Sequence, residues 1–150
     1  MYKSLDTISL KALNQFNDNT MVSHLGIEFT EVSKDSVIAK MPVDQRTIQP
    51  FGILHGGANV TLAETVGSVA GNLLLDDDHF CMGLDINANH THQVRFNENK
   101  PIQYVYGEGK PLHLGRSTQV WEILIRNNED KLCCVSRLTL YIGKKIVIDN

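Results

Sequence analysis

Hydrophobic and polar positions follow two different periods along this chain, and each change of period marks a new element. Between Ser4 and Phe16, apolar side chains recur near helical spacing, which predicts a short amphipathic helix. The polar run of residues 17–19 ends it. Apolar positions then recur over short runs broken by polar turn residues, a pattern typical of strands. Two strands are expected here, joined by a short turn, over residues 25–32 and 36–43.

The next stretch combines a turn-rich loop, Gln49–Gly57, with a long helix that ends near Leu75 before an acidic turn at residues 76–78. Plotted at about 100° per residue, the helix separates into two faces. One face carries the apolar stripe Leu62, Val66, Val69 and Leu73. The opposite face carries small or polar residues: Gly57, Val60, Glu64, Gly67, Ser68 and Gly71.

The interior glycines of this helix need an explanation, because each costs roughly 1 kcal/mol relative to alanine. Something is therefore expected to approach the backbone closely at Gly67 and Gly71. Tight packing on a sheet or helix of the same chain is one explanation, and a neighbouring subunit is the other. A membrane-spanning pair is excluded, because polar residues interrupt the apolar run.

After the helix the pattern becomes entirely that of strands, which are expected over residues 80–87, 102–107, 119–126 and 132–142. The last two are joined as a hairpin by the turn at residues 127–130. Two strands, one long helix and four further strands predict an α+β layer fold. An antiparallel sheet covered by one helix, forming a single domain over residues 1–150, is the economical arrangement.

The charge and the cysteine content of the chain exclude several classes of protein and site. The net charge of -3 and the pI near 6.0 argue against a general nucleic-acid or membrane-surface binder. Three cysteines, two of them adjacent, give neither a disulfide framework nor a zinc spacing. A reducing cytoplasm is the simplest fit to this cysteine pattern, and the N-terminus lacks the apolar segment of a signal peptide.

Glu64 is the strongest candidate for chemistry, because a carboxylate in an otherwise uncharged helix is rarely buried without a partner or a task. The first turn of that helix offers unpaired N–H groups and a partial positive charge. His55 either caps this turn or acts on a substrate, and Gln49 adds an amide donor nearby. Donors at a helix start with a carboxylate beyond them suit acyl transfer.

Two further segments carry polar groups. His90 and His92 alternate as metal ligands on a strand would, but no third ligand is evident nearby, and no metal is expected. Residues 110–117 are expected to form a polar loop. In it, Lys110 and Arg116 either contact phosphate groups or are solvated surface charges.

With these segments identified, the chain resembles the hotdog-fold thioesterases of the PaaI type, the group that contains the Arthrobacter-type 4-hydroxybenzoyl-CoA thioesterases. Within the group it is similar to the 1,4-dihydroxy-2-naphthoyl-CoA hydrolases and the enterobactin-synthesis proofreading thioesterases. The resemblance runs from about Met21 to Ile142. The matching segments are residues 49–52, 55–58, 62–65, 67–71, 87–90 and 111–116. Relative to those groups, this chain carries additional residues over Phe96–Pro101.

The resemblance implies an antiparallel sheet wrapped around one long central helix, in a homo-oligomer that is a dimer of dimers with its active site at the dimer interface. It implies that Glu64 is the catalytic carboxylate and that the Gly56 N–H polarises the thioester carbonyl. Gln49 and His55 would orient the acyl end, and Ser68 would assist the carboxylate or the attacking water. Contacts to substrate and coenzyme A would come from Gly57, Gly83, His90, Thr91, His92, Gln93, His113, Leu114, Gly115, Arg116, Ser117 and Thr118.

The predicted function is therefore hydrolysis of small-molecule acyl-CoA thioesters, with a preference for aromatic acyl groups. Coenzyme A takes part as substrate and product, and no cofactor is expected. A proofreading thioesterase acting on an acyl carrier protein, an enoyl-thioester hydratase and a non-catalytic acyl-CoA-binding module remain alternatives. The hydratase would need a different acid–base pair, and the binding module would not need Glu64.

Overall fold

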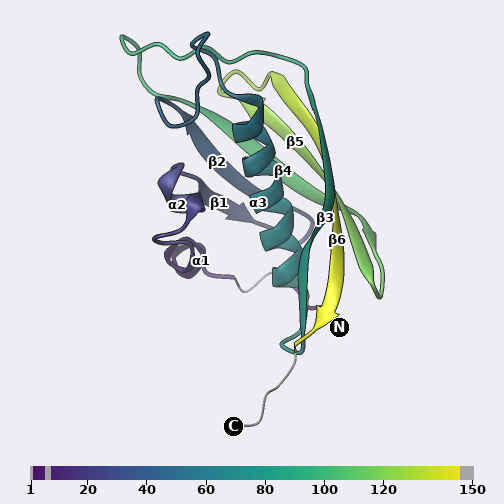
Figure 1. Cartoon of the computed structure of the whole chain (residues 1–150). Coiled ribbons are helices and arrows are strands. Elements are labelled where there is room, and N and C mark those ends of the chain that lie inside the picture. The colour runs from purple at the N-terminus through teal and green to yellow at the C-terminus, as the bar shows by residue number, and fades with distance from the viewer. Residues whose placement is uncertain (1, 6–7, 146–150) are drawn as a thin grey trace.

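The computed structural model describes residues 2–5 and 8–145, and it arranges them as one long helix against a curved sheet (Figure 1). Two short helices, α1 (Leu10–Phe16) and α2 (Met21–His24), precede the sheet. The long helix α3 spans Gly56–Leu74. The six strands are β1 (Glu28–Val32), β2 (Val37–Val43), β3 (His79–His90), β4 (Gln103–Leu114), β5 (Thr118–Asn127) and β6 (Leu132–Lys144).

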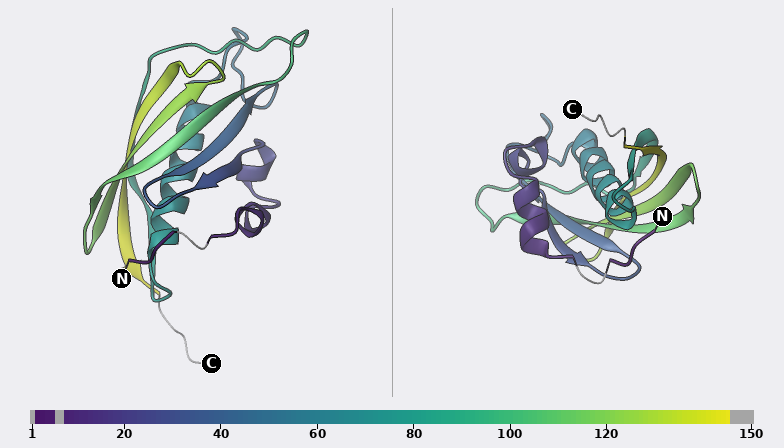
Figure 2. Two further views of the ribbon diagram at one scale, coloured as in Figure 1. Left: turned by 180° about the vertical axis from the view of Figure 1, so that it is seen from behind. Right: turned by 90° about the horizontal axis from the view of Figure 1, so that it is seen from below.

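All strand pairs of the sheet are antiparallel, and the spatial order is β1-β2-β4-β5-β6-β3. The sheet curves around α3, which lies along its concave face (Figure 2). The edge strand β3 pairs with β6 on one side and with no other strand of the described residues on the other. Its side chains Met82 and Leu84 are 52% and 61% exposed.

No helix of the described residues is long and apolar enough to cross a membrane.

The core lies between α3 and the sheet. Leu62, Ala63, Val66 and Ala70 of the helix are fully buried against sheet residues such as Trp121, Ile123, Leu138 and Leu140. Burial of these apolar side chains is the main favourable contribution to folding, at roughly 25 cal/mol per Å² of apolar surface removed from water. It also fixes the rotation of α3 about its own axis, and so decides which helical side chains face outward.

The predicted assignment of helix faces was partly wrong. Gly67 and Gly71 are buried against the sheet of the same chain and not turned toward another subunit. A Cβ on Gly67 would lie 2.6 Å from Leu138 Cδ2, and one on Gly71 would lie 2.5 Å from Leu140 Cδ1. Close helix–sheet packing, one of the two explanations drawn from the sequence, therefore accounts for both glycines.

Two predicted boundaries also differ from the structure. The first helix begins at Leu10, where the Ser9 side chain accepts a hydrogen bond from the Ala12 N–H and caps it. Part of the earlier stretch, residues 6–7, lies outside the described residues. The polar loop expected over residues 110–117 is wrong for most of its length, because β4 continues to Leu114 and only the turn beyond it leaves the sheet.

The continuation of β4 past Pro111 has a simple cause. Strand β2 pairs with β4 only as far as Gly109, so beyond that point β4 has a partner on one side alone, in β5. A proline lacks the N–H needed for a ladder bond and is tolerated where one side of the strand is free. Pro111 lies opposite Trp121, next to a register shift that absorbs the irregularity.

Candidate active site

The loop before α3 is held in place by a segment far along the chain. The loop turns at Gly52, whose φ of 69° favours glycine, and the Gly52 N–H donates to the Gln49 carbonyl at 2.9 Å. The Leu54 N–H donates to the Val94 carbonyl at 2.8 Å, and the Phe96 N–H donates to the Gly52 carbonyl at 2.9 Å. These backbone bonds fix the approach to the helix.

His55 is the N-cap of α3. Its backbone is extended, with φ −71° and ψ 135°, and its Nδ1 accepts a hydrogen bond from the Gly57 N–H at 2.8 Å. Because Nδ1 is the acceptor, the proton of the neutral ring lies on Nε2. The N–H of Gly56, the first helical residue, makes no hydrogen bond to the described residues. The helix therefore begins with one free donor, oriented by its own cap.

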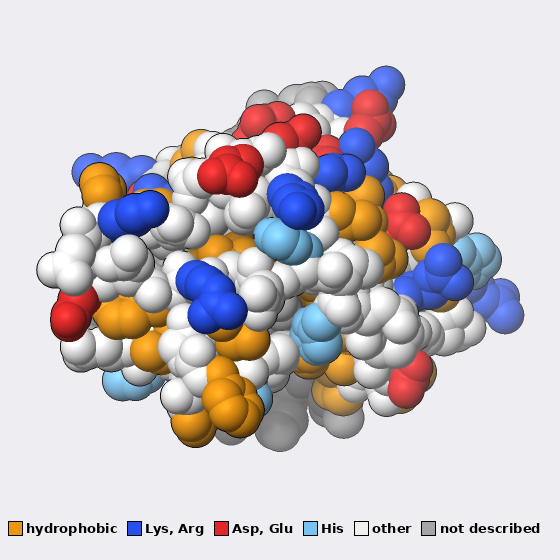
Figure 3. Space-filling view, turned by 90° about the horizontal axis from the view of Figure 1, so that it is seen from above, with side chains coloured by type: hydrophobic (Ala, Val, Ile, Leu, Met, Phe, Trp, Pro, Cys, Tyr) orange, Lys and Arg blue, Asp and Glu red, His pale blue; other side chains and the backbone are white. Residues whose placement is uncertain are grey.

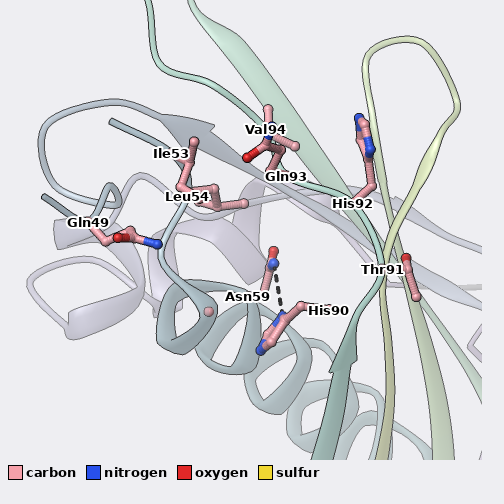
Figure 4. Close-up of a pocket in the computed structure, with 10 residues that line it drawn as sticks. Gln49, Ile53, Leu54, Asn59, His90, Thr91, His92, Gln93 and Val94 are labelled. Carbon is pink, nitrogen blue, oxygen red and sulfur yellow. Dashed lines mark hydrogen bonds between the residues drawn. The ribbon is translucent and has the colours of Figure 1, made fainter. Parts of the chain in front are cut away.

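A cavity of about 490 Å³ opens beside this helix start (Figure 4). It brings together six residues predicted for the site: Gln49, Gly56, His90, Thr91, His92 and Gln93. Four lining residues were not predicted, namely Ile53, Leu54, Asn59 and Val94. The one sequence signal that could have indicated Asn59 is its place as a polar residue within the helix. Ile53, Leu54 and Val94 look like ordinary core residues in the sequence.

Not every predicted side chain in the cavity is free to bind a substrate. The Thr91 hydroxyl donates to the Leu132 carbonyl at 2.8 Å, and its N–H donates to the Cys133 carbonyl at 2.8 Å, so Thr91 anchors the end of β3 to β6. Strand β3 continues three residues beyond the expected end at Asn87, so His90 is its last residue and His92 lies beyond it. Within residues 2–5 and 8–145, no three metal-ligating side chains are grouped to hold an ion.

Glu64 lies two turns further along α3, on the flank of the helix that meets β3. The Ser68 hydroxyl, one turn beyond it, donates to Glu64 Oε1 at 3.0 Å. Gly83 of β3 lies directly opposite, because a Cβ there would be 2.5 Å from Glu64 Oε1. The strand therefore leaves room for the carboxylate at a residue without a side chain. The half-buried carboxylate is held by a hydroxyl and by the shape of the adjacent strand.

Asn72 fixes this part of β3 against the helix. Its Nδ2 donates to the Ser68 carbonyl at 2.9 Å and to the Cys81 carbonyl at 3.1 Å, and its Oδ1 accepts from the Cys81 N–H at 3.0 Å. Both ends of the amide are satisfied, so it sets the register between α3 and β3 two residues before Gly83. The hydrogen bonds between Asn72 and the Cys81 backbone therefore place Gly83 opposite Glu64.

The buried thiol near Glu64 is not a second nucleophile. Cys81 is 6% exposed, and burial, assisted by the negative charge of Glu64, raises its pKa to about 12. The thiol form is therefore retained at neutral pH. Of the groups near Ser68, the carboxylate is the one available for chemistry.

An apolar groove of about 510 Å³ lies on the outer side of α3, next to Ser68. We call it the α1–α3 groove, because its lining residues come from these two helices: Leu13, Phe16, Ser68, Val69, Asn72 and Leu73. Val69 and Leu73 belong to the apolar stripe that the sequence predicted for the core. They are half-buried, so they pack against the core, as predicted, and also line this groove.

The predicted contacts of residues 113–118 do not join the cavity within one chain. The turn after β4 is closed by the Gly115 N–H, which donates to the Thr118 carbonyl at 2.9 Å. Gln119, which follows it, donates to the Gly71 carbonyl near the end of α3. The turn therefore lies toward the far end of the helix from Gly56. Lys110 already pairs with Glu108 at 2.8 Å.

The surface around the loops that follow β2 and β3 carries no dominant charge. Figure 3 shows this end of the molecule, where basic, acidic and histidine side chains are interspersed with apolar ones. Arg46, in the loop that follows β2, makes a salt bridge to Asp44 at 2.6 Å. The guanidinium holds the pKa of the Asp44 carboxyl below its usual value.

Comparisons with known proteins decide the family. The family model described as "Thioesterase superfamily" matches residues 51–134, which is more than half of the chain. The chain is a member of the thioesterase superfamily. The 1,4-dihydroxy-2-naphthoyl-CoA hydrolase of Escherichia coli is 50% identical over 135 residues, covering 90% of this chain and 95% of that protein. The proofreading thioesterase EntH of Klebsiella pneumoniae is 46% identical over 131 residues, covering 87% and 91%.

Solved structures of thioesterases agree with this assignment. A thioesterase of Haemophilus influenzae superposes with a TM-score of 0.87 at 51% identity and covers 94% of each chain. A mutant thioesterase of Pseudomonas aeruginosa gives a TM-score of 0.88 at 39% identity, covering 95% of this chain and 99% of that one. The predicted hotdog fold, with six antiparallel strands around a 19-residue helix, is confirmed. This protein is an enzyme, a thioester hydrolase.

Proposed function

We propose that this thioesterase hydrolyses acyl-CoA thioesters with an aromatic acyl group, and that Glu64 is its catalytic carboxylate. The observation that carries the proposal is the arrangement around Glu64. Its carboxylate accepts a hydrogen bond from Ser68 and occupies space that the missing side chain of Gly83 provides. A carboxylate that two elements accommodate in this way, and that forms no salt bridge with any described residue, is suited to attack or to proton transfer.

Two routes use the same atoms. As a nucleophile, Glu64 adds to the thioester carbon, the C–S bond breaks with release of CoA thiolate, and water then hydrolyses the mixed anhydride. As a general base, Glu64 takes a proton from water as the hydroxide adds to that carbon. The C–S bond breaks next, and the thiolate receives the proton. Both routes need only water as co-reactant.

The start of α3 supplies the complementary donor. The Gly56 N–H has no partner within the described residues, and the helix dipole adds partial positive charge there. A thioester carbonyl oxygen gains negative charge in either transition state, so a fixed donor at this place stabilises it. Gln49 lines the same cavity, whereas His55 is engaged in capping and orients the first turn.

Substrate class is supported by two features. The α1–α3 groove offers an apolar space beside Ser68 that suits a ring or chain attached to the thioester. The relative named 1,4-dihydroxy-2-naphthoyl-CoA hydrolase has an aromatic acyl-CoA in its name. The relatives named proofreading thioesterase EntH favour a second candidate, a proofreading thioesterase, for which we propose thioesters on a carrier protein as substrates.

We also propose that two chains share each site. Gly56 and Glu64 lie eight residues apart in one helix, or about 12 Å along its axis, which is too far for both to contact one thioester group. Pairing of the exposed edge strand β3 with a second copy would bring Glu64 of one chain near Gly56 of the other.

The free cysteines Cys81, Cys133 and Cys134 fit a reducing compartment such as the cytoplasm.

Replacement of Glu64 by glutamine tests the catalytic assignment. Hydrolysis of benzoyl-CoA, followed as free thiol with a thiol reagent, is expected to fall by about 10²-fold or more while binding of benzoyl-CoA survives. A Glu64→Gln enzyme with near-normal turnover would remove this residue from the mechanism. A parallel screen of aryl-CoA, fatty acyl-CoA and aryl-carrier-protein thioesters separates the substrate classes.

Subunit mixing tests the shared site. Inactive Glu64→Gln subunits are mixed with inactive Gln49→Ala/His55→Ala subunits, and exchange is verified by mass spectrometry. In a mixed dimer with shared sites, one site carries both lesions and the other carries neither, so part of the activity returns. Sites built within single chains would return no activity beyond the sum of the two parents.

A further inference from the structure

Asn59 is the one residue of α3 that is buried, polar and incompletely hydrogen-bonded within the described residues. Its side chain is 4% exposed, and its Oδ1 has no hydrogen-bond partner. It lines the cavity beside the helix start, and Figure 4 shows its oxygen directed away from His90 toward Leu54 and Gln93. A buried acceptor without a donor disfavours folding, so this amide is not explained by stability.

The other end of the amide contacts His90. Asn59 Nδ2 lies 3.5 Å from His90 Nδ1. With the amide nitrogen facing the ring, Nδ1 is the acceptor and the proton of the neutral ring lies on Nε2. At this length the hydrogen bond is weak and adds little stability. Hydrogen bonds that serve catalysis are often long before substrate binds and shorten in the complex.

The ring of His90 lies against the first residue of α3. A Cβ on Gly56 would be 2.9 Å from His90 Nε2 and 3.3 Å from both adjacent ring carbons. The glycine therefore leaves room for the imidazole, and both Gly56 and His90 line the cavity. Two donors, one from the backbone and one from the ring, thus border the same space.

We propose that Asn59 is a positioning residue for thioester hydrolysis. It holds His90 in the Nε2–H tautomer over Gly56, so that Nε2–H and the Gly56 N–H both donate to the carbonyl oxygen of the bound thioester. The proposal rests on the proposed place of that carbonyl at the start of α3. In this role His90 transfers no proton. Its Nε2–H donates a hydrogen bond that stabilises the negative charge developing on the carbonyl oxygen.

Asn72 provides the contrast that separates positioning from structure. This second asparagine of α3 satisfies both ends of its amide through the Ser68 and Cys81 backbone. An amide of that kind stabilises the fold, and Asn72→Ala is expected to lower the thermal midpoint. Asn59→Ala removes an unsatisfied acceptor and introduces a better helix former, so its thermal midpoint should stay the same or rise.

The ring tautomer is measured first, because it needs no substrate. Protein with ¹⁵N-labelled histidine is studied by NMR at about pH 9, where histidine side chains are ordinarily neutral. The His90 signals are those lost in His90→Phe. The wild type should show the Nε2–H form, and Asn59→Asp, which can only accept from Nδ1, should shift the ring toward Nδ1–H. An Nδ1–H ring in the wild type would overturn the proposal.

Kinetics then test the consequence. Asn59→Ala should lower kcat for benzoyl-CoA by about tenfold, the size of one misplaced donor, with little change in KM. In a His90→Phe background the same substitution should cost nothing further, because Asn59 acts through His90. Unchanged kcat in Asn59→Ala, or losses that multiply independently in the double variant, would refute the role.

Failure of the proposed function would look different. If the wild type released thiol from none of the aryl-CoA, fatty acyl-CoA and aryl-carrier-protein thioesters, the substrate proposal would be wrong. The tautomer measurement would still decide whether Asn59 holds His90 over Gly56. If another thioester proved to be the substrate, the kinetic comparison would be made with that compound, with the same expected loss.

Discussion

Replacement of Gly83 by alanine is expected to disable the enzyme without unfolding it. The new Cβ would lie 2.5 Å from Glu64 Oε1 and 3.2 Å from Glu64 Cδ. Ordinary contacts of a Cβ begin near 3.4 Å, so the carboxylate must move by about 3.4 − 2.5 = 0.9 Å. A displacement of about 1 Å of a reacting group can cost roughly 10²-fold in rate. We therefore expect kcat to fall by about that factor.

The stability of the same variant should hardly change. The atom that must move is the end of a flexible, half-buried side chain, and Gly83 has no positive φ that alanine would strain. Alanine also removes some of the chain entropy of the unfolded state, which is worth about 0.4–1 kcal/mol of stability. Urea unfolding should give a free energy of unfolding equal to that of the wild type or slightly higher.

A matched control exists on the neighbouring strand. A Cβ on Gly143 of β6 would lie 2.6 Å from the Phe80 ring, an equally close contact away from Glu64. Gly143→Ala should therefore perturb stability more than turnover, the reverse of Gly83→Ala. In a Glu64→Gln background, Gly83→Ala should have no further effect on rate. Wild-type kcat in Gly83→Ala would refute the placement of the carboxylate against β3.

Three further predictions follow from the same geometry. Ser68→Ala should lower kcat by roughly tenfold, the size of one hydrogen bond, and a loss as large as that of Glu64→Gln would instead make the hydroxyl a nucleophile. Gly71→Ala should lower the free energy of unfolding in urea by about 1–3 kcal/mol, because its Cβ would overlap Leu140, and an unchanged value would contradict the packing of α3 on the sheet. Burial raises the pKa of all three thiols, to about 12 for Cys81 and about 11 for Cys134, so a thiol reagent should label the native protein slowly. After denaturation in guanidinium it should label Cys81, Cys133 and Cys134, and fast labelling of the native protein would contradict their burial.

The sequence was most informative where one physical signal dominated. The length and nearly uncharged character of the central helix predicted α3 nearly to the residue, and the isolated Glu64 is the residue on which the proposed site is built. Rotation of the helix was predicted less well, because glycines carry no apolar signal. The sheet supplies the bulk opposite them through Leu138 and Leu140, and no helical plot contains that information.

Other features could not be predicted, because they depend on contacts between distant segments. Proline, glycine and charged residues over 110–117 are typical of a loop, yet the free side of β4 lets the strand continue through Pro111. Asn59 looked like a polar interruption, and only the end of β3, which places His90 next to it, gives it a partner. The role of Gly83 likewise depends on the register between α3 and β3.

The contacts that hold the loop before α3 have a consequence for how this enzyme can diverge. Residues 52–54 are tied to residues 94–96 by main-chain hydrogen bonds, and these bonds exist whatever side chains the two segments carry. Sequence drift in either segment therefore leaves the entrance to the helix in place. Residues 97–101 begin where these bonds end, so changes in their side chains leave the bonds intact. The start of α3 at Gly56 therefore keeps its place when these neighbouring residues change.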